Sequence, residues 1–183
     1  MIKKIKLFLI IGLLAVCADM GFSTDLTNMN FSFDKIKLVH ERATRAFNRP
    51  HDNRYDFKYR AGLRDYQRAR GNCRSRTGSY CSRYCKNGIK SYKDFLAIIR
   101  YRHTHADAAQ AQQFATRYKT RASEVLRALR RGGQRVKSIR MINFGLGIYN
   151  LGRTKFSRRE YKEAVKKFES SAGFFWNFIK AQR

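Results

Sequence analysis

The amino-acid sequence predicts a mainly α fold, a single-domain compact bundle of about six helices that follows a cleaved signal peptide. Three observations support this prediction. Only one proline, Pro50, interrupts the 183 residues, and proline is the residue that a helix interior tolerates least. Apolar residues recur mostly three or four positions apart, which is the period of a helix face. Hydrophobic residues make up 43% of the chain, enough for a packed core at this length.

Residues 1–18 have the pattern of a signal peptide. Three lysines lie within the first six residues, an apolar run follows from Leu7 to Cys17, and a small-residue cleavage sequence ends at Ala18. A membrane-spanning helix needs about 20 apolar residues, and Asp19 ends this run well before that length. We therefore expect a secreted protein, located outside the cell or, in a bacterium, in the periplasm.

A polar N-terminal segment, 19–32, and a helical domain, 33–183, are expected after the signal peptide. The polar segment contains the sequon Asn30-Phe31-Ser32, which is a glycosylation acceptor in hosts that glycosylate secreted proteins. In the helical domain, apolar residues at helical spacing from Phe33 to Phe47 predict a first helix, which Pro50 ends.

A second helix is predicted from Arg54 to Arg70, because tyrosines and a leucine share one side and cations the other. The glycines of Gly71-Asn72 and Gly78-Ser79 are typical of turns, so 71–90 is expected to be a basic, cysteine-containing loop. Ser91 and Asp94 have the spacing of a capping box, which predicts a third helix from Tyr92 to about Tyr101.

The strongest helical pattern is an apolar stripe that runs from Asp107 to Arg131 and ends at Gly132-Gly133. A fifth helix is predicted from Arg135 to Leu151. Ser157 and Glu160 have the spacing of a second capping box, which predicts the start of a final helix, so that 141–181 is a C-terminal helix pair.

The C-terminal stretch "NFGLGIYNLGRTKFSRREYKEAVKKFESSAGFF" resembles one tetratricopeptide repeat. Leu151-Gly152, Tyr161, Ala164 and Phe168 match the Leu-Gly, second Tyr, Ala and Phe positions of that family. The resemblance covers about 34 residues, one repeat length. It implies a pair of antiparallel helices and protein binding through a helical groove.

The chain is strongly cationic, with 40 Lys and Arg against 13 Asp and Glu and a formal net charge of +27. Cleavage after Ala18 removes three lysines and no acid, so the charge falls from +27 to +24. Such a field attracts phosphate, sulfate or carboxylate polymers and repels other cations. The expected partner is an anionic polymer or anionic cell surface, namely a sulfated glycan, a nucleic acid or an anionic membrane.

Two parts of the chain carry the candidate polyanion-binding residues: the segment from Arg54 to Lys86 and the face from Arg117 to Arg140. Arginine predominates there, and its guanidinium group binds phosphate or sulfate through two hydrogen bonds. The residues we select are Arg54, Lys58, Arg60, Arg64, Arg68, Arg70, Arg74, Arg76, Arg83, Arg117, Arg121, Arg127, Arg130 and Arg131.

Three cysteines remain after cleavage, Cys73, Cys81 and Cys85. In a secreted protein they predict one disulfide among the three, and we expect Cys73 to be one partner, because Cys81 and Cys85 would lie one helical turn apart. The remaining thiol is either buried and inert or links two chains into a dimer. A zinc site with a histidine as fourth ligand is the alternative, but the spacing matches no common zinc motif.

No Ser/His/Asp motif, glycine-rich phosphate loop or diagnostic carboxylate pair is present. The closely spaced His103 and His105 would serve acid–base chemistry, as in a basic secreted nuclease, or simply be solvated. We expect no enzymatic activity, no cofactor and no metal.

Two functions follow from these patterns. The first is a secreted helical protein that binds anionic polymers or surfaces, as a host-interaction effector or a defence protein. The second is a protein-interaction module, a cytokine-like bundle or tetratricopeptide-like groove, whose contact surface is formed by aromatic residues of the last two helices. These residues are Tyr149, Phe174, Phe175, Trp176 and Phe178.

Overall fold

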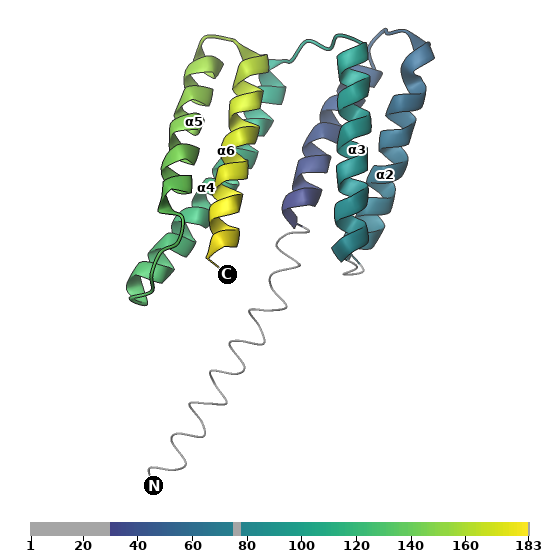
Figure 1. The fold of residues 1–183 in the computed structure, drawn as a ribbon. Helices are drawn as coiled ribbons and strands as arrows, with labels where there is room; N and C mark the ends of the chain where they lie inside the picture. The colour runs from purple at the N-terminus through teal and green to yellow at the C-terminus, as the bar shows by residue number, and fades with distance from the viewer. Residues whose placement is uncertain (1–29, 75–77, 183) are drawn as a thin grey trace. The chain divides into compact units, whose positions relative to one another are not determined.

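The computed structural model describes residues 30–74 and 78–182, and their regular structure is helical (Figure 1). The prediction of a mainly α fold is therefore confirmed. The elements in chain order are a helix at 30–47, the short 3-10 helix η1 (Asn53–Tyr55), α2 (Asp56–Arg74), α3 (Gly78–Ile98), α4 (His105–Arg131), α5 (Ile139–Ser157) and α6 (Tyr161–Ala181). The predicted signal peptide lies outside the described residues.

The helices group into two compact units. The first unit ends at Ile99 and contains the helix 30–47, η1, α2 and α3. The second unit begins at Arg100 and contains α4, α5 and α6. Each unit has its own buried core.

The first unit is built around aromatic residues of α3. Tyr92 and Phe95 are fully buried, together with Ile36 and Val39 of the helix 30–47. Gly62 lets α2 approach this core closely, because a Cβ atom at that position would lie 2.6 Å from the Tyr92 ring. Contacts that short do not occur between real atoms, so only glycine permits this packing of α2 on α3.

In the second unit, glycines of α5 allow the same close approach to aromatic rings of α6. Phe168 and Phe175 of α6 are fully buried. A Cβ atom at Gly152 would lie 2.9 Å from Phe168, and one at Gly145 would lie 2.7 Å from Phe175. The side of α5 that carries these two glycines therefore faces α6, while α4 covers α6 with buried alanines and with Tyr118.

The predicted long helix is confirmed, and its first turn is fixed by a capping box that the sequence analysis missed. The hydroxyl of Thr104 accepts from the backbone N–H of Asp107, and the Asp107 carboxylate accepts from the backbone N–H of Thr104 at 2.7 Å. This arrangement satisfies two of the donors that every helix start leaves open.

The two predicted capping boxes are wrong. Ser91 lies in the middle of α3, and the hydroxyl of Ser157 donates to the Thr154 carbonyl within α5 instead. The α6 N-cap is Glu160, whose side chain makes no capping hydrogen bond and pairs with Lys155 at 2.7 Å.

The predicted loop at 71–90 is helical over its described residues, since α2 continues to Arg74 and α3 begins at Gly78. Gly71 and Asn72 did not end α2, because packing of an apolar helix face outweighs weak local propensities. Gly88 shows this directly: a Cβ atom there would lie 2.6 Å from Ile36, so the glycine serves close packing inside a helix.

Among the helices of the described residues, none combines the length and the apolar character that crossing a membrane requires.

Two glycines of α5 provide a matched test of this packing. We expect Gly145→Ala to destabilise the second unit by about 1–3 kcal/mol, because the methyl group displaces the buried Phe175 ring. Gly147→Ala has open space around it and should stabilise by about 0.5–1 kcal/mol through helix propensity. Urea unfolding followed by the fluorescence of the only tryptophan, Trp176, measures both, and equal effects would contradict the packing.

Candidate polyanion-binding surface

Three predicted arginines form a row on the outer side of α2. Arg60, Arg64 and Arg68 are exposed and four residues apart, so they follow one another along one side of the helix at about 6 Å per step. Gly62, which contacts α3, lies on the opposite side. We call these three residues the α2 arginine row.

Aromatic rings accompany this row. The guanidinium group of Arg68 lies 5.7 Å from the centre of the Tyr84 ring on α3, a cation–π distance that orients the side chain without neutralising it. Phe57, one turn before Arg60 on the same side, is 60% exposed. Cations beside exposed rings suit a ligand that offers both anionic groups and flat or apolar parts.

Two predicted residues near the start of α2 already have acidic partners. Arg54 donates to both carboxylate oxygens of Asp52, with the shortest distance 2.6 Å, and these hydrogen bonds lower the pKa of that carboxyl group. The Lys58 ammonium lies 3.7 Å from the Asp94 carboxylate. These two cations are therefore less suited to an external anion than the α2 arginine row.

The remaining predicted residues divide between the two units. Arg70 and Arg83 are exposed in the first unit. In the second unit, exposed side chains on α4 are those of Arg117, Arg121, Arg127, Arg130 and Arg131. The last two lie in the final turn of α4, where they also complement the negative pole of the helix. Arg76 and the side chain of Arg74 lie outside the described residues.

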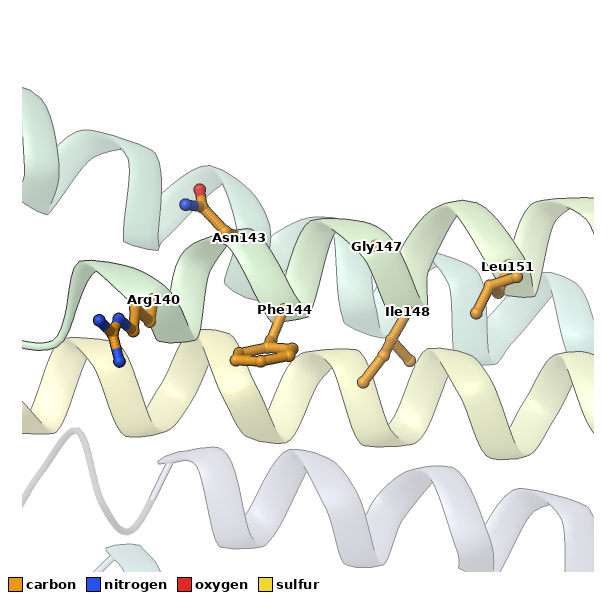
Figure 2. A pocket seen from close by; sticks show the side chains of 6 residues that line it. All are labelled: Arg140, Asn143, Phe144, Gly147, Ile148 and Leu151. Carbon is orange, nitrogen blue, oxygen red and sulfur yellow. The ribbon is translucent and has the colours of Figure 1, made fainter.

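An exposed apolar stripe on α5 was missed by the sequence analysis. Phe144, Gly147, Ile148 and Leu151 line an open hollow together with Arg140 and Asn143. Figure 2 shows Arg140, Phe144, Ile148 and Leu151 projecting from the same side of α5, while Asn143 points away. We call Phe144, Gly147, Ile148 and Leu151 the α5 stripe.

The aromatic contact surface predicted for the last two helices is largely core. Tyr149, Phe175, Trp176 and Phe178 are buried, and only Phe174 is partly exposed. The hydroxyl groups of Tyr149 and Thr116 lie 2.8 Å apart, which ties α5 to α4. A protein-interaction surface on these helices would therefore consist of the α5 stripe, not of the predicted aromatic set.

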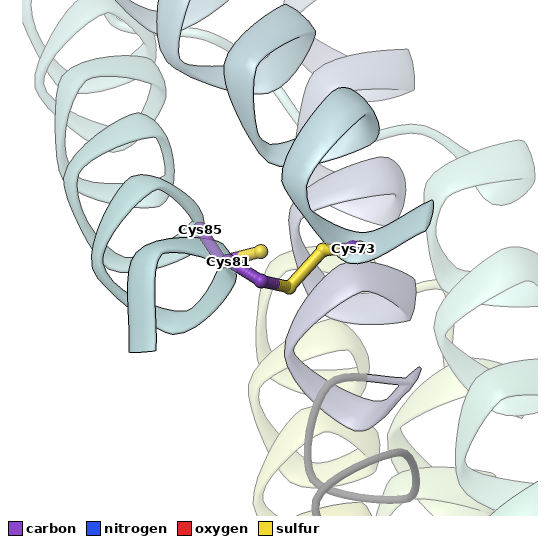
Figure 3. A group of neighbouring side chains, drawn as sticks. All are labelled: Cys73, Cys81 and Cys85. Carbon is purple, nitrogen blue, oxygen red and sulfur yellow. A yellow bond between two sulfur atoms is a disulfide. The ribbon is translucent and has the colours of Figure 1, made fainter. Parts of the chain in front are cut away.

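The cysteines lie where α2 ends and α3 begins (Figure 3). Cys73 and Cys81 form a disulfide with a Cα–Cα distance of 5.0 Å, which agrees with the expected bridge from Cys73. Cys85 is a free, fully buried thiol one turn further along α3. Its burial raises its pKa to about 12, so it is a poor nucleophile at neutral pH and is not exposed to a second chain.

The sulfur atoms of the three cysteines lie within 4.8 Å of one another, a separation that one metal ion could bridge. Metal ions bind cysteine as thiolate, and the disulfide occupies two of the three sulfur atoms. The site in this oxidised form therefore offers a metal one thiol only.

The two predicted histidines have different surroundings. His105 is the first residue of α4, and its ring lies 4.8 Å from Phe156 and 5.9 Å from Tyr161. His103 precedes the helix, with its ring 5.6 Å from Tyr101. His105 is thus exposed, with its ring against the edge of an aromatic pair in the second unit.

A third histidine, His40, is half-buried among tyrosines of the first unit. Its Nδ1 atom lies 2.6 Å from the hydroxyl oxygen of the buried Tyr92, and its ring stacks on Tyr66 at 4.1 Å. Burial lowers the pKa of His40.

Asn30, the predicted glycosylation acceptor, is exposed and is the first described residue of the helix 30–47.

Comparisons of the chain with protein-family models, with curated proteins and with solved structures found no match.

Reduction of the disulfide should destabilise the first unit by about 2–3 kcal/mol, the chain-entropy value for a closed loop of eight residues. Intact mass should show one bridge, and alkylation of the remaining thiol should be slow until the protein unfolds. The control is Cys85→Ala, which leaves the bridge in place. A loss of stability on reduction that is equal in Cys73→Ser and in the native chain would contradict this role.

Protonation of His40 should lower the stability of the first unit as the pH drops through about 6.5, the ordinary pKa of histidine. The pKa of His40 is lowered in the folded state, so the unfolded chain binds the proton more readily and acid favours unfolding. His51 opposes this effect, because hydrogen bonds to the Arg49 carbonyl and Asp56 raise its pKa. His40→Gln should reduce the acid loss and His51→Gln increase it, as measured by urea unfolding with circular dichroism at several pH values.

Proposed function

We propose that the protein binds anionic polymers or surfaces as a secreted, non-enzymatic factor. The observation that carries the proposal is the α2 arginine row: three exposed arginines, four residues apart, on the side of α2 opposite the packed side. A row of this kind contacts successive charged groups of a polymer, and each contact releases counterions. The charge of +27 supports the same partner at longer range.

Solvation of the helices is a weaker explanation for this charge. Solubility requires only a modest net charge of either sign, and acidic residues serve it better than basic ones. The chain instead has about three cations for each acid. Repulsion among so many like charges opposes compact folding, and a polyanion relieves that repulsion when it binds.

The alternative function, a protein-interaction module of the tetratricopeptide or cytokine-like type, has one supporting observation, the exposed α5 stripe. The close helix pair α5 and α6 is compatible with it, since Ala164 and Phe168 are buried at the interface. The charge of the chain would then restrict such a partner to an acidic surface.

The salt dependence of binding to a short duplex DNA tests the main proposal. The slope of log K against log salt concentration should become less steep by about 3 in the triple variant Arg60→Gln/Arg64→Gln/Arg68→Gln, at about 0.9 for each lost phosphate contact. The matched control removes the same charge from exposed arginines of the second unit, as Arg102→Gln/Arg153→Gln/Arg158→Gln.

Two results would contradict the proposal. One is that the native protein leaves a heparin column at the same low salt concentration at which basic proteins leave an ordinary cation exchanger. The other is an equal change of slope in both triple variants, because net charge would then act without a site.

A further inference from the structure

Helix α5 has apolar residues on two different sides, and only one of them is buried inside the second unit. Gly145, Tyr149 and Gly152 form the inner side and pack on the other helices. The α5 stripe lies on the outer side, more than a quarter turn away at 100° for each residue. The core of the second unit therefore does not bury the α5 stripe.

The outer side is open. Phe144 is 62% exposed and Leu151 is 52% exposed. A Cβ atom at Gly147, between them, would meet no atom within 4 Å. The ring of Phe144 lies 6.1 Å from that of Phe174, so the apolar surface extends onto α6. Isolated exposed apolar residues are ordinary, but a continuous run of them marks an interaction site.

Arg140 and Lys155 lie at the two ends of the α5 stripe, and α5 itself contains no acid. Arg140 precedes Phe144 by four residues and Lys155 follows Leu151 by four, so both lie on the same side of the helix. Between Glu124 and Glu160 the sequence has ten Lys and Arg and no Asp or Glu. Lys155 pairs with Glu160, the first acid after this run, so the exposed Arg140 is the better placed of the two cations to meet an anionic group.

This combination selects among anionic partners. A polysaccharide or the outside of a duplex offers charge but no apolar layer that would bury Phe144 and Leu151. An anionic bilayer offers both, because its phosphate and carboxylate groups lie a few ångströms above the acyl chains. Large apolar residues bracketed by cations, on a helix lying in the interface, are the pattern that binds such a surface.

We propose that the second unit docks on an anionic lipid bilayer with α5 parallel to the surface, the α5 stripe among the upper acyl chains and Arg140 at the head groups. The proposal rests on the proposed function, because the cationic surface supplies the attraction. It adds that the anionic partner is a membrane and that α5 makes the contact.

Vesicles of phosphatidylcholine with and without phosphatidylserine test the contact. The native protein should bind the mixed vesicles, and Phe144→Ser/Leu151→Ser should weaken that binding by about tenfold or more, as expected for two partly buried side chains. Its retention on heparin should not change. The control is Leu146→Ser, an exposed apolar residue on another side of α5, which should bind as the native protein does.

A gain of affinity provides a second test, which a loss of folding in the serine variant does not affect. The open space at Gly147 admits a larger side chain, so Gly147→Leu should strengthen binding to the mixed vesicles several-fold. The matched control is Gly147→Gln, whose helix propensity is close to that of leucine but whose side chain is polar. An indole introduced by Phe144→Trp should also be quenched by brominated acyl chains, while Trp176 is buried and serves as the background.

The outcomes separate this proposal from the proposed function. Vesicle binding that is unchanged in Phe144→Ser/Leu151→Ser, or heparin binding without vesicle binding, overturns the membrane contact and leaves polyanion binding intact. A protein that binds neither vesicles nor polyanions overturns both. If sedimentation shows that the native chain is a dimer and Phe144→Ser/Leu151→Ser a monomer, the α5 stripe binds a second copy of the chain. If the protein binds only an acidic protein, the α5 stripe binds that partner. Either result overturns the membrane contact.

Discussion

Glycines at the contacts between helices are the constraint on which the packing of both units depends. They determine which side of α2 and of α5 faces inward and which side is exposed. Gly62 lies against Tyr92 in the first unit, and Gly145 and Gly152 lie against Phe175 and Phe168 in the second. A side chain at any of these positions would collide with a buried ring, so the rotation of α2 and α5 about their own axes is fixed. The α2 arginine row and the α5 stripe are exposed because each lies away from those glycines.

The fold class and the long helix were predictable because they depend on local signals. The apolar period of α4 extends over seven turns, and a pattern of that length has few alternative explanations. The region from Gly71 to Gly88 was mispredicted for the opposite reason. Its glycines have the composition of turns, yet Gly88 lies inside α3 where the side chain of Ile36 leaves no room for a Cβ atom. Such a requirement comes from a residue about fifty positions away, which no local window contains. The division after Ile99 is likewise marked by no proline or glycine-rich linker.

The candidate site shows the same contrast. Exposure of the arginines was predictable, since burying an unpaired guanidinium group is costly and most arginines stay in water. The α5 stripe was not, because α5 is apolar on nearly every side and its period does not indicate which side is inward. For the same reason, the sequence did not indicate that the aromatic residues of α5 and α6 are mostly buried, as are Tyr149, Phe175, Trp176 and Phe178. The inward side of α5 is marked by its glycines: two of them lie against aromatic rings and the third has open space around it. Only the position of α6 shows which glycine is which.

The two surfaces would act at different distances and respond differently to salt. Attraction by the cations extends over about 8–10 Å at physiological ionic strength and weakens as salt is added. Burial of Phe144 and Leu151 begins only on contact and does not weaken with salt, since it depends on apolar area removed from water. A partner that engages only the α2 arginine row would be released by salt, whereas one that also engages the α5 stripe would be retained after the electrostatic attraction is screened. The residual, salt-resistant part of binding is therefore the contribution that belongs to α5, and it separates an anionic membrane from an anionic polymer.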